Sequence, residues 1–414
     1  MDDGPLVIEN LFDKLGAPFK KGGPLEKFYP AFQAGETIVL TPGLVTKSGP
    51  HIRDAIDLKR FMIMVVVAIT PCALFGVFNA GYQSVTYYNQ VMTPITGVTI
   101  DNNIFNYIAQ GLFRFIPLYA ITLAAGGLVE AIFAVVRKHE INEGFLVTSM
   151  LFPLTLPPTT PLWMAAIGII FGVVIGKEVF GGTGMNIFNP ALTARAFLFF
   201  AFPAYMAGAN NVWVASPMDF STFTEMTIDF TKISSGVDGI SGATPLLSAF
   251  NGELSTTYSQ LVMFLGLVPG SIGETSTLMA IVGAGLLIVT GIGSAKTMFG
   301  CVIGALATAS IFYGLSDVDT HREILTMNPI NHLMMGGFAF GAVYMATDPV
   351  SSPATAKGKL VYGILIGSIC VLIRNINPAF PEGMMLAILF MNLFAPLIDH
   401  YVIEAQIKRR FSRG

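Results

Sequence analysis

The sequence predicts an all-α polytopic membrane protein, with about ten transmembrane helices in two five-span inverted repeats that contain broken or half helices. Composition is the first reason: 53% of the 414 residues are hydrophobic and 12% are charged, whereas about a quarter of the residues of an ordinary soluble domain are charged. The second reason is that apolar runs recur in both halves, and the third is that Lys and Arg gather at alternate ends of these runs. The net charge of −3 offers no concentrated basic surface for nucleic acid.

The first half of the chain predicts a cytoplasmic N-terminal arm and a five-span repeat. Residues 1–60 are polar and basic and make up the arm, and residues 61–204 make up the repeat. The runs at 61–80 and 115–136 are each long enough to cross a hydrocarbon core of about 30 Å, and an outer loop is expected between them at 81–110. Three shorter spans are expected at 144–156, 162–176 and 191–204.

Segments rich in Pro and Gly interrupt the shorter spans. Pro157, Pro158 and Pro161 follow the third span, and the run from Gly181 to Pro190 follows the fourth. Non-helical backbone at membrane depth is tolerated only where protein or a cavity supplies its hydrogen bonds. These breaks therefore favour a binding site over loose packing.

The second half repeats this layout after an extracytoplasmic linker at 205–276. The second repeat covers 277–403, and a basic cytoplasmic tail covers 404–414. Its five spans are expected at 277–292, 297–314, 333–346, 360–373 and 384–402. The Pro-rich and Asn-Pro segments at 157–161 and 186–190 are echoed at 349–353 and 375–378. Because each repeat has an odd number of spans, the second copy is inverted, which is the plan of transporters whose broken helices surround a site at the membrane midplane.

The distribution of positive charge predicts which side of the membrane each loop faces. Cytoplasmic loops carry an excess of Lys and Arg. If the N-terminus is cytoplasmic and ten spans alternate, all but four of the 23 Lys and Arg residues lie inside, with Arg195 counted near the inner end of its span. The four outside are Arg114, Lys232, Arg322 and Arg374. Both termini are therefore expected in the cytoplasm and Thr244 outside.

A polar interval near the middle of the chain contains the segment Asp238-Gly-Ile-Ser241-Gly242-Ala-Thr244-Pro245. Thr244 can be interpreted as a helix N-cap, with Pro245 at the first helical position, where the missing N–H costs nothing. The same position also suits a phosphate ester, because a helix N-terminus offers free N–H groups and partial positive charge to an anion.

This segment matches the (D)xx(S/T)GAT pattern of flavinylation sites, in which a flavin transferase attaches FMN through its phosphate to the final Thr. Over essentially its full length the chain also resembles the B-subunit family of the bacterial sodium-translocating NADH:quinone oxidoreductase. Further resembling stretches lie at 41–47, 137–144, 177–184, 189–192, 346–350 and 381–386. The D-subunit family of the Rnf ferredoxin:NAD oxidoreductase shares the motif and the ten-span plan but generally lacks the long N-terminal arm. A non-redox inverted-repeat channel or transporter is a further alternative.

The resemblance implies a translocase subunit of the bacterial inner membrane, within a six-subunit complex in which NADH is oxidised on another subunit. It implies covalent FMN on Thr244, with Asp238, Ser241 and Gly242 as part of the motif that the flavin transferase reads. Electrons would pass from FMN to riboflavin and then to ubiquinone, coupled to Na⁺ export. We expect no metal ion, haem or iron–sulfur cluster in this chain.

The resemblance also implies a neighbourhood for riboflavin at Thr148, Asn186 and Asn189. The two carboxamides could hydrogen-bond to the donor and acceptor edge of an isoalloxazine. The alternative is that both Asn residues are cap and turn residues before Pro190.

Gly126, Gly127 and Glu130, in the second span, border the quinone site if the resemblance holds. Paired glycines can equally permit close helix packing. Glu130 and Asp399 are also the candidates for a cation pathway, because ionisable groups within a membrane are costly and usually functional. The alternative for such acids is a solvated carboxylate at the end of a span.

Overall fold

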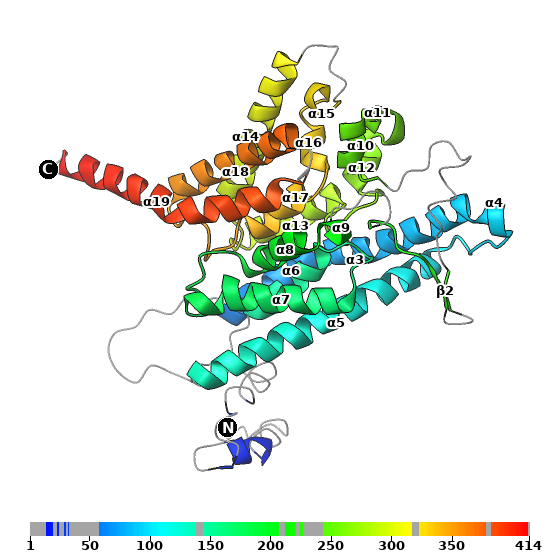
Figure 1. Ribbon diagram of the computed structural model, residues 1–414. Helices are drawn as coiled ribbons and strands as arrows, with labels where there is room; N and C mark the ends of the chain where they lie inside the picture. Colours follow the sequence, from blue (N-terminus) through cyan, green and yellow to red (C-terminus); the bar gives the residue numbers. More distant parts are fainter. Residues whose placement is uncertain are drawn as a thin grey trace, which may run out of the picture.

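The computed structural model describes residues 14–19, 23–24, 29, 32, 58–137, 144–206, 212–220, 224–226, 243–316, 323–377 and 382–412. Six helices in this part of the chain are long and apolar enough to cross a membrane (Figure 1): α3 (Leu58–Val91), α5 (Ile104–Arg137), α7 (Leu162–Gly176) continued by η3 (Glu178–Phe180), α14 (Ala295–Leu315), α18 (Ala356–Ile376) and α19 (Met384–Phe411). Three shorter apolar helices accompany them: α6 (Gly144–Leu154), α8 (Pro190–Ala201) and α13 (Thr277–Val289). The prediction of an all-α polytopic membrane protein is confirmed.

The first two helices are longer than the sequence predicted. Each has 34 residues, or about 51 Å at 1.5 Å per residue. The expected outer loop at 81–110 is wrong for most of its length, because α3 continues to Val91 and α5 begins at Ile104, with α4 (Thr93–Thr96) between them. The polar aromatic residues of this region support the helix pair: the rings of Tyr82 and Tyr107 pack edge to face, with centroids 5.4 Å apart.

The expected span at 333–346 is broken into three pieces. These are α16 (Asn331–Met334), α17 (Phe338–Phe340) and the π-helix η5 (Gly341–Met345). Gly336, between α16 and α17, has a φ of +59°, a conformation that glycine adopts without steric cost. A π-helical turn is a frequent mark of a functional site, and η5 is buried throughout. The prediction of a broken helix therefore holds at this position.

Close backbone contacts hold the second half together. A Cβ atom on Gly304 of α14 would lie 2.0 Å from the carbonyl oxygen of Ile364 of α18. Reciprocally, a Cβ atom on Gly367 of α18 would lie 2.0 Å from the carbonyl oxygen of Cys301. Small residues let helices of membrane bundles approach in this way. The two helices therefore form one tightly packed pair.

A small helical cluster stands at one end of the bundle. It contains α10 (Pro245–Asn251), α11 (Leu254–Thr257), α12 (Gln260–Leu265) and α15 (Glu323–Thr326), which share a core that includes Leu246, Met263 and Ile324. Figure 1 shows these helices together beside α16. The remaining described elements are η1 (Ala17–Phe19), α9 (Pro203–Met206) and the antiparallel strands β1 (Met218–Asp219) and β2 (Thr224–Glu225).

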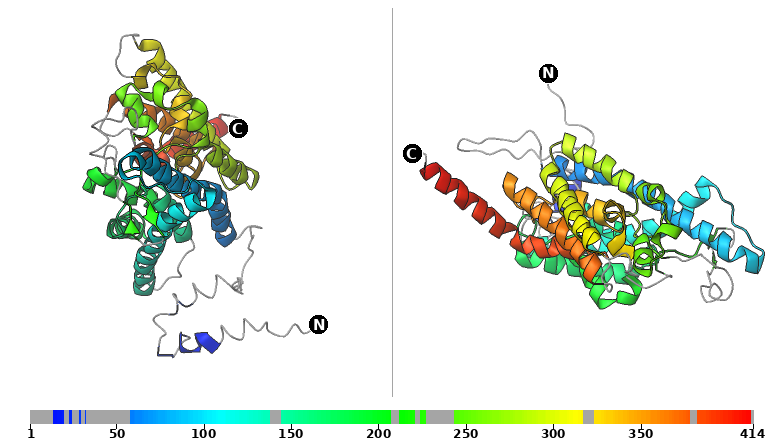
Figure 2. Two further views of the ribbon diagram at one scale, coloured as in Figure 1. Left: turned by 90° about the vertical axis from the view of Figure 1, so that its right-hand side faces the viewer. Right: turned by 90° about the horizontal axis from the view of Figure 1, so that it is seen from above.

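The main core joins residues of both halves of the chain in one cluster. Five apolar segments of the first half, α3 and α5 to α8, are matched in number by α13, α14, the broken segment, α18 and α19 in the second. Figure 2 shows the C-terminal end of α19 projecting from the other helices. The inverted relation between the two repeats stays a prediction.

Candidate functional site

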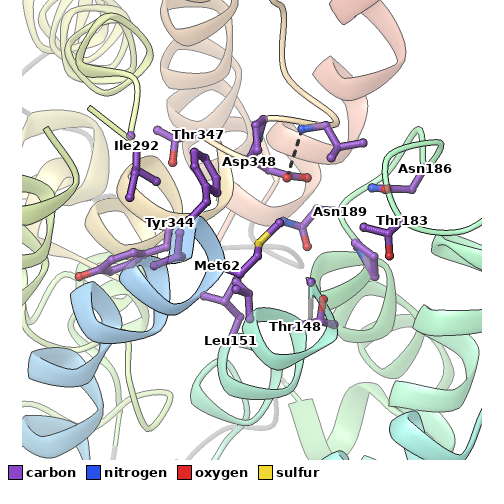
Figure 3. Close-up of a pocket in the computed structure, with 18 of the residues that line it drawn as sticks. Met62, Thr148, Leu151, Thr183, Asn186, Asn189, Ile292, Tyr344, Thr347 and Asp348 are labelled. Carbon is purple, nitrogen blue, oxygen red and sulfur yellow. Dashed lines mark hydrogen bonds between the residues drawn. The ribbon is translucent and has the colours of Figure 1, made fainter. Parts of the chain in front are cut away.

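A cavity with about 770 Å³ of empty space lies between the two halves of the chain, and we call it the first cavity. Figure 3 shows its labelled residues approaching one another from α3, α6, the loop before α8 and the segment around η5. Its polar lining includes Thr148, Lys177, Thr183, Asn186, Asn189, Tyr344, Thr347 and Asp348. The apolar lining includes Phe61, Met62, Val65, Leu151, Leu287 and Ile292.

The three residues expected at the riboflavin site meet in the first cavity. Thr148 is buried on α6, while Asn186 and Asn189 lie in the loop that leads into α8. Asn189 is the N-cap of α8, and its Oδ1 accepts hydrogen bonds from Ala191 N (3.0 Å) and Leu192 N (3.3 Å). Asn186 Nδ2 donates to the carbonyl of Phe188 (2.9 Å). The cap and turn interpretation is therefore right, and it orients both amides at the cavity wall.

The second half of the chain supplies the opposite wall. Tyr344 of η5 donates a hydrogen bond to the carbonyl of Ala68 in α3 (2.8 Å). Gly283 of α13 makes room for this hydroxyl, because a Cβ atom there would lie 1.7 Å from it. Asp348 accepts a hydrogen bond from Ser351 Oγ (2.7 Å). These bonds fix the wall that faces Asn189.

Two neighbouring ion pairs join the end of α7 to α5. Lys177 pairs with Glu130, and both side chains are buried. The next residue, Glu178, accepts a hydrogen bond from Arg137 Nη1 (3.2 Å), and its carbonyl accepts one from Arg137 Nη2 (2.7 Å). Glu130 is therefore not a solvated carboxylate at the end of a span, and its partner Lys177 also lines the first cavity.

The paired glycines of α5 differ from each other. A Cβ atom on Gly126 would lie 2.4 Å from Cζ of Phe145 and 2.9 Å from Cγ1 of Ile169, so Gly126 permits close packing of α5 on α6 and α7. A Cβ atom on Gly127 would make an ordinary contact of 3.6 Å with Phe145. The packing interpretation thus accounts for Gly126, and the quinone site at Gly126, Gly127 and Glu130 stays a prediction.

Thr244 opens onto a second cavity, which has about 700 Å³ of empty space. Thr244 is the N-cap of α10 and its hydroxyl accepts a hydrogen bond from Leu247 N (3.3 Å), as the cap interpretation predicted. The lining includes Phe199, Trp213, Val268, Met334, Glu274 and Glu382. The other three motif residues, Asp238, Ser241 and Gly242, lie outside the described residues.

Three charged side chains meet beside the second cavity. Glu274, in the loop before α13, and Glu382, before α19, line it, and Arg195 Nη2 lies 3.5 Å from Glu382 Oε2. Burial, followed by the negative charge of Glu382, raises the pKa of Glu274 to about 8. Arg195 is buried in the interior, where Nη1 also contacts the sulfur of Met206. Arg195 therefore has an acidic partner inside the fold, and its place near the inner end of its span stays a prediction.

Two further charged residues have structural partners. Arg374, counted as an outer charge, is fully buried and donates to the carbonyls of His332 (2.6 Å) and Met335 (2.8 Å). Asp399 accepts hydrogen bonds from Ala354 N (2.6 Å) and from Thr355 N (3.0 Å). It therefore holds the start of α18, and its place on a cation pathway stays a prediction.

Several lining residues were not predicted from the sequence. Lys177 stands in one of the resembling stretches, 177–184, and Thr347 and Asp348 stand in another, 346–350. That signal could have marked them as candidates. Tyr344 and Trp213 carried no signal, because only packing brings them to the cavities.

Comparison with known proteins agrees with the resemblance. The model of the NQR2, RnfD, RnfE family matches residues 45–408. Similar proteins include the B subunit of the Na(+)-translocating NADH-quinone reductase of Yersinia pestis, which is 46% identical over 98% of this chain and 99% of the relative. The same subunit from Klebsiella pneumoniae (strain 342) is 46% identical over 98% of this chain and 100% of the relative. That from Chromohalobacter salexigens is 47% identical over 98% and 96%.

Proposed function

The chain belongs to the NQR2, RnfD, RnfE family, and from this premise we propose that it is the flavin-carrying membrane subunit of a Na⁺-pumping NADH:quinone oxidoreductase in the bacterial inner membrane. In this proposal Thr244 carries covalent FMN on the extracytoplasmic side, the first cavity binds riboflavin, and ubiquinone is reduced beside Gly126, Gly127 and Glu130. Both termini are cytoplasmic, and NADH is oxidised on another subunit of a six-subunit complex. Electron transfer through the chain is coupled to Na⁺ export.

The observation that carries the proposal is the meeting of Thr148, Asn186 and Asn189 in the first cavity. Its lining combines mainly apolar side chains with a few polar groups, as small-molecule sites do. An isoalloxazine has two apolar faces and a polar edge. The lining supplies apolar side chains from α3, α6 and α13, and it groups hydroxyl and amide groups around the loop before α8.

The residues present therefore fit a flavin. Thr148, Asn186 and Asn189 would hold its polar edge by hydrogen bonds, because an Asn amide offers both a donor and an acceptor. Tyr344 is fixed by its bond to Ala68, so its wall of the cavity is pre-formed. Bound flavin supplies one-electron chemistry, and the protein supplies binding, orientation and electrostatics.

The surroundings of Thr244 support the attachment site. Thr244 is half-buried at the edge of a cavity, and Trp213 and Phe199 line the same space. The isoalloxazine ring of an attached flavin could pack against these aromatic and apolar side chains. The motif and this cavity support Thr244 independently, because the motif is a property of the sequence alone and the cavity depends on the fold.

The similar B subunits favour a quinone reductase over an Rnf-type complex, because the chain matches them over nearly their full length. Purified complex is expected to reduce quinone with NADH. Coupling of NAD to ferredoxin instead would favour the Rnf alternative.

The test of the attachment site is flavin fluorescence of the chain in a denaturing gel. We expect fluorescence in the wild-type chain and none in Thr244→Val. Ser259→Ala is the matched control, because Ser259 caps α12 through the same kind of hydrogen bond, to Val262 N, but lies outside the motif. It loses a cap worth about 1 kcal/mol and should keep its fluorescence.

Covalent flavin retained in Thr244→Val would refute the attachment site. Absence of any flavin from the wild-type chain would favour a non-redox transporter. Riboflavin released from the denatured complex, and lost from an Asn186→Leu variant, would support the assignment of the first cavity.

A further inference from the structure

Lys177 touches both predicted small-molecule sites of the first half. Lys177 is one of the residues that line the first cavity. Its ammonium pairs with Glu130 of α5, which lies one turn after the glycines expected at the quinone site. Lys177 has only 5% of its surface exposed. It is therefore a buried cation placed between the two predicted sites.

Because Lys177 is buried, its positive charge interacts strongly with nearby charges. Two charges taken out of water need each other, because removing one partner leaves an uncompensated charge. Among the described residues that line the first cavity, Lys177 and Asp348 carry the charges, one from each half of the chain. Asp348 is held by Ser351, whereas a lysine ammonium sits at the end of a flexible four-carbon stem. Its charge can therefore be shared between Glu130 and an occupant of the cavity.

We propose that Lys177 is a positioning residue that sets the reduction potential of the flavin bound in the first cavity, and that Glu130 limits how much of this positive charge the flavin experiences. This inference rests on the proposed function. One electron arrives from the donor flavin, no bond forms or breaks in the protein, and the Lys177 ammonium offsets the added negative charge. Such an interaction is strong in a poorly hydrated interior, where the effective dielectric constant is far below that of water.

The neighbouring ion pair provides a matched control. Arg137 and Glu178 join the same two helices, since Glu178 follows Lys177 in the chain and Arg137 follows Glu130 by two helical turns. Neither of them lines the first cavity. Arg137→Gln therefore weakens the junction of α7 with α5 without changing any charged residue that lines the cavity.

The test uses the full chain in lipid nanodiscs, with riboflavin as the probe and a Thr244→Val background that removes covalent flavin. Mediated spectroelectrochemical titration measures the midpoint potential, and fluorescence quenching measures riboflavin affinity. Lys177→Gln is expected to lower the ratio of affinities for reduced and oxidised flavin about tenfold, a shift of about 59 mV for one electron. Glu130→Gln should shift the potential in the opposite direction, Lys177→Arg should restore it, and Arg137→Gln should change the ratio less than about twofold.

The outcomes separate this inference from the function on which it rests. If the wild-type chain binds riboflavin but Lys177→Gln and Arg137→Gln give the same potential, the role of Lys177 is refuted while the riboflavin site stands. If Lys177→Gln and Glu130→Gln shift the potential in the same direction, the shared-charge argument is wrong. Failure of the wild-type chain to bind riboflavin overturns both.

Discussion

Replacing Gly304 with alanine tests whether α14 and α18 are as close as the structure has them. A Cβ atom at this position would lie 2.0 Å from the carbonyl oxygen of Ile364 and 2.8 Å from its carbon. Real Cβ atoms essentially never come within 3.0 Å of a heavy atom outside their own residue and its chain neighbours, and the obstacle is backbone rather than a movable side chain. The helices must therefore part by about 1 Å, and overpacking of this kind costs about 1–3 kcal/mol.

Gly314→Ala, on the same helix, is the control. A Cβ atom there meets nothing within 4 Å, so this variant adds the same methyl group without the backbone obstacle. The difference between the two variants then isolates the contact. SDS-driven unfolding in mixed micelles, followed by circular dichroism, should place Gly304→Ala about 1–3 kcal/mol below Gly314→Ala. Equal stabilities would show that the two backbones do not touch at Gly304.

Two further predictions concern the carboxylates. The pKa of Glu274 is raised from 4.5 to about 8, so between these pH values the folded chain holds a proton that the unfolded chain has released, and this residue makes the free energy of unfolding fall as pH rises. When unfolding is measured from pH 5 to 9, the decline in stability should be weaker in Glu274→Gln than in the wild-type chain. Parallel curves for the two would count against a protonated Glu274. Asp399→Ala removes the acceptor for two backbone N–H groups at the start of α18 and should lower the free energy of unfolding in the SDS assay by about 1–3 kcal/mol. An unchanged unfolding curve would argue against the structural role. The Na⁺ affinity of the complex tests a cation role separately.

Local features of the chain were predictable from the sequence because they depend on neighbouring residues. The cap at Thr244, the turn before Pro190 and the short third and fifth spans of the first half follow from Pro, Gly and hydroxyl residues in fixed order. The ends of α3 and α5 did not follow, because residues 81–91 and 104–110 are interspersed with Tyr, Asn and Gln yet are helical. Tyr82 of α3 packs against Tyr107 of α5. The hydropathy of one chain segment does not reveal such a partner on another helix.

The sequence does not predict which residues line the same cavity. Thr148 and Asp348 are 200 positions apart, and only the packing of the two halves of the chain brings them to one space. The buried charges show the same limit. A charge count assigns Arg195 and Arg374 only to a side of the membrane, whereas in the fold Arg195 pairs with Glu382 and Arg374 donates hydrogen bonds to carbonyl groups.

Helix α8 runs from one cavity to the other. Asn189 caps its beginning at the first cavity, and Phe199, ten residues on, lines the second. Its 12 residues span about 18 Å, so the length of α8 sets the distance between the two cavities. One inserted residue would lengthen the helix by about 1.5 Å and rotate one end against the other by about 100°. Homologous genes should therefore accept substitutions along α8 more readily than any change in its length.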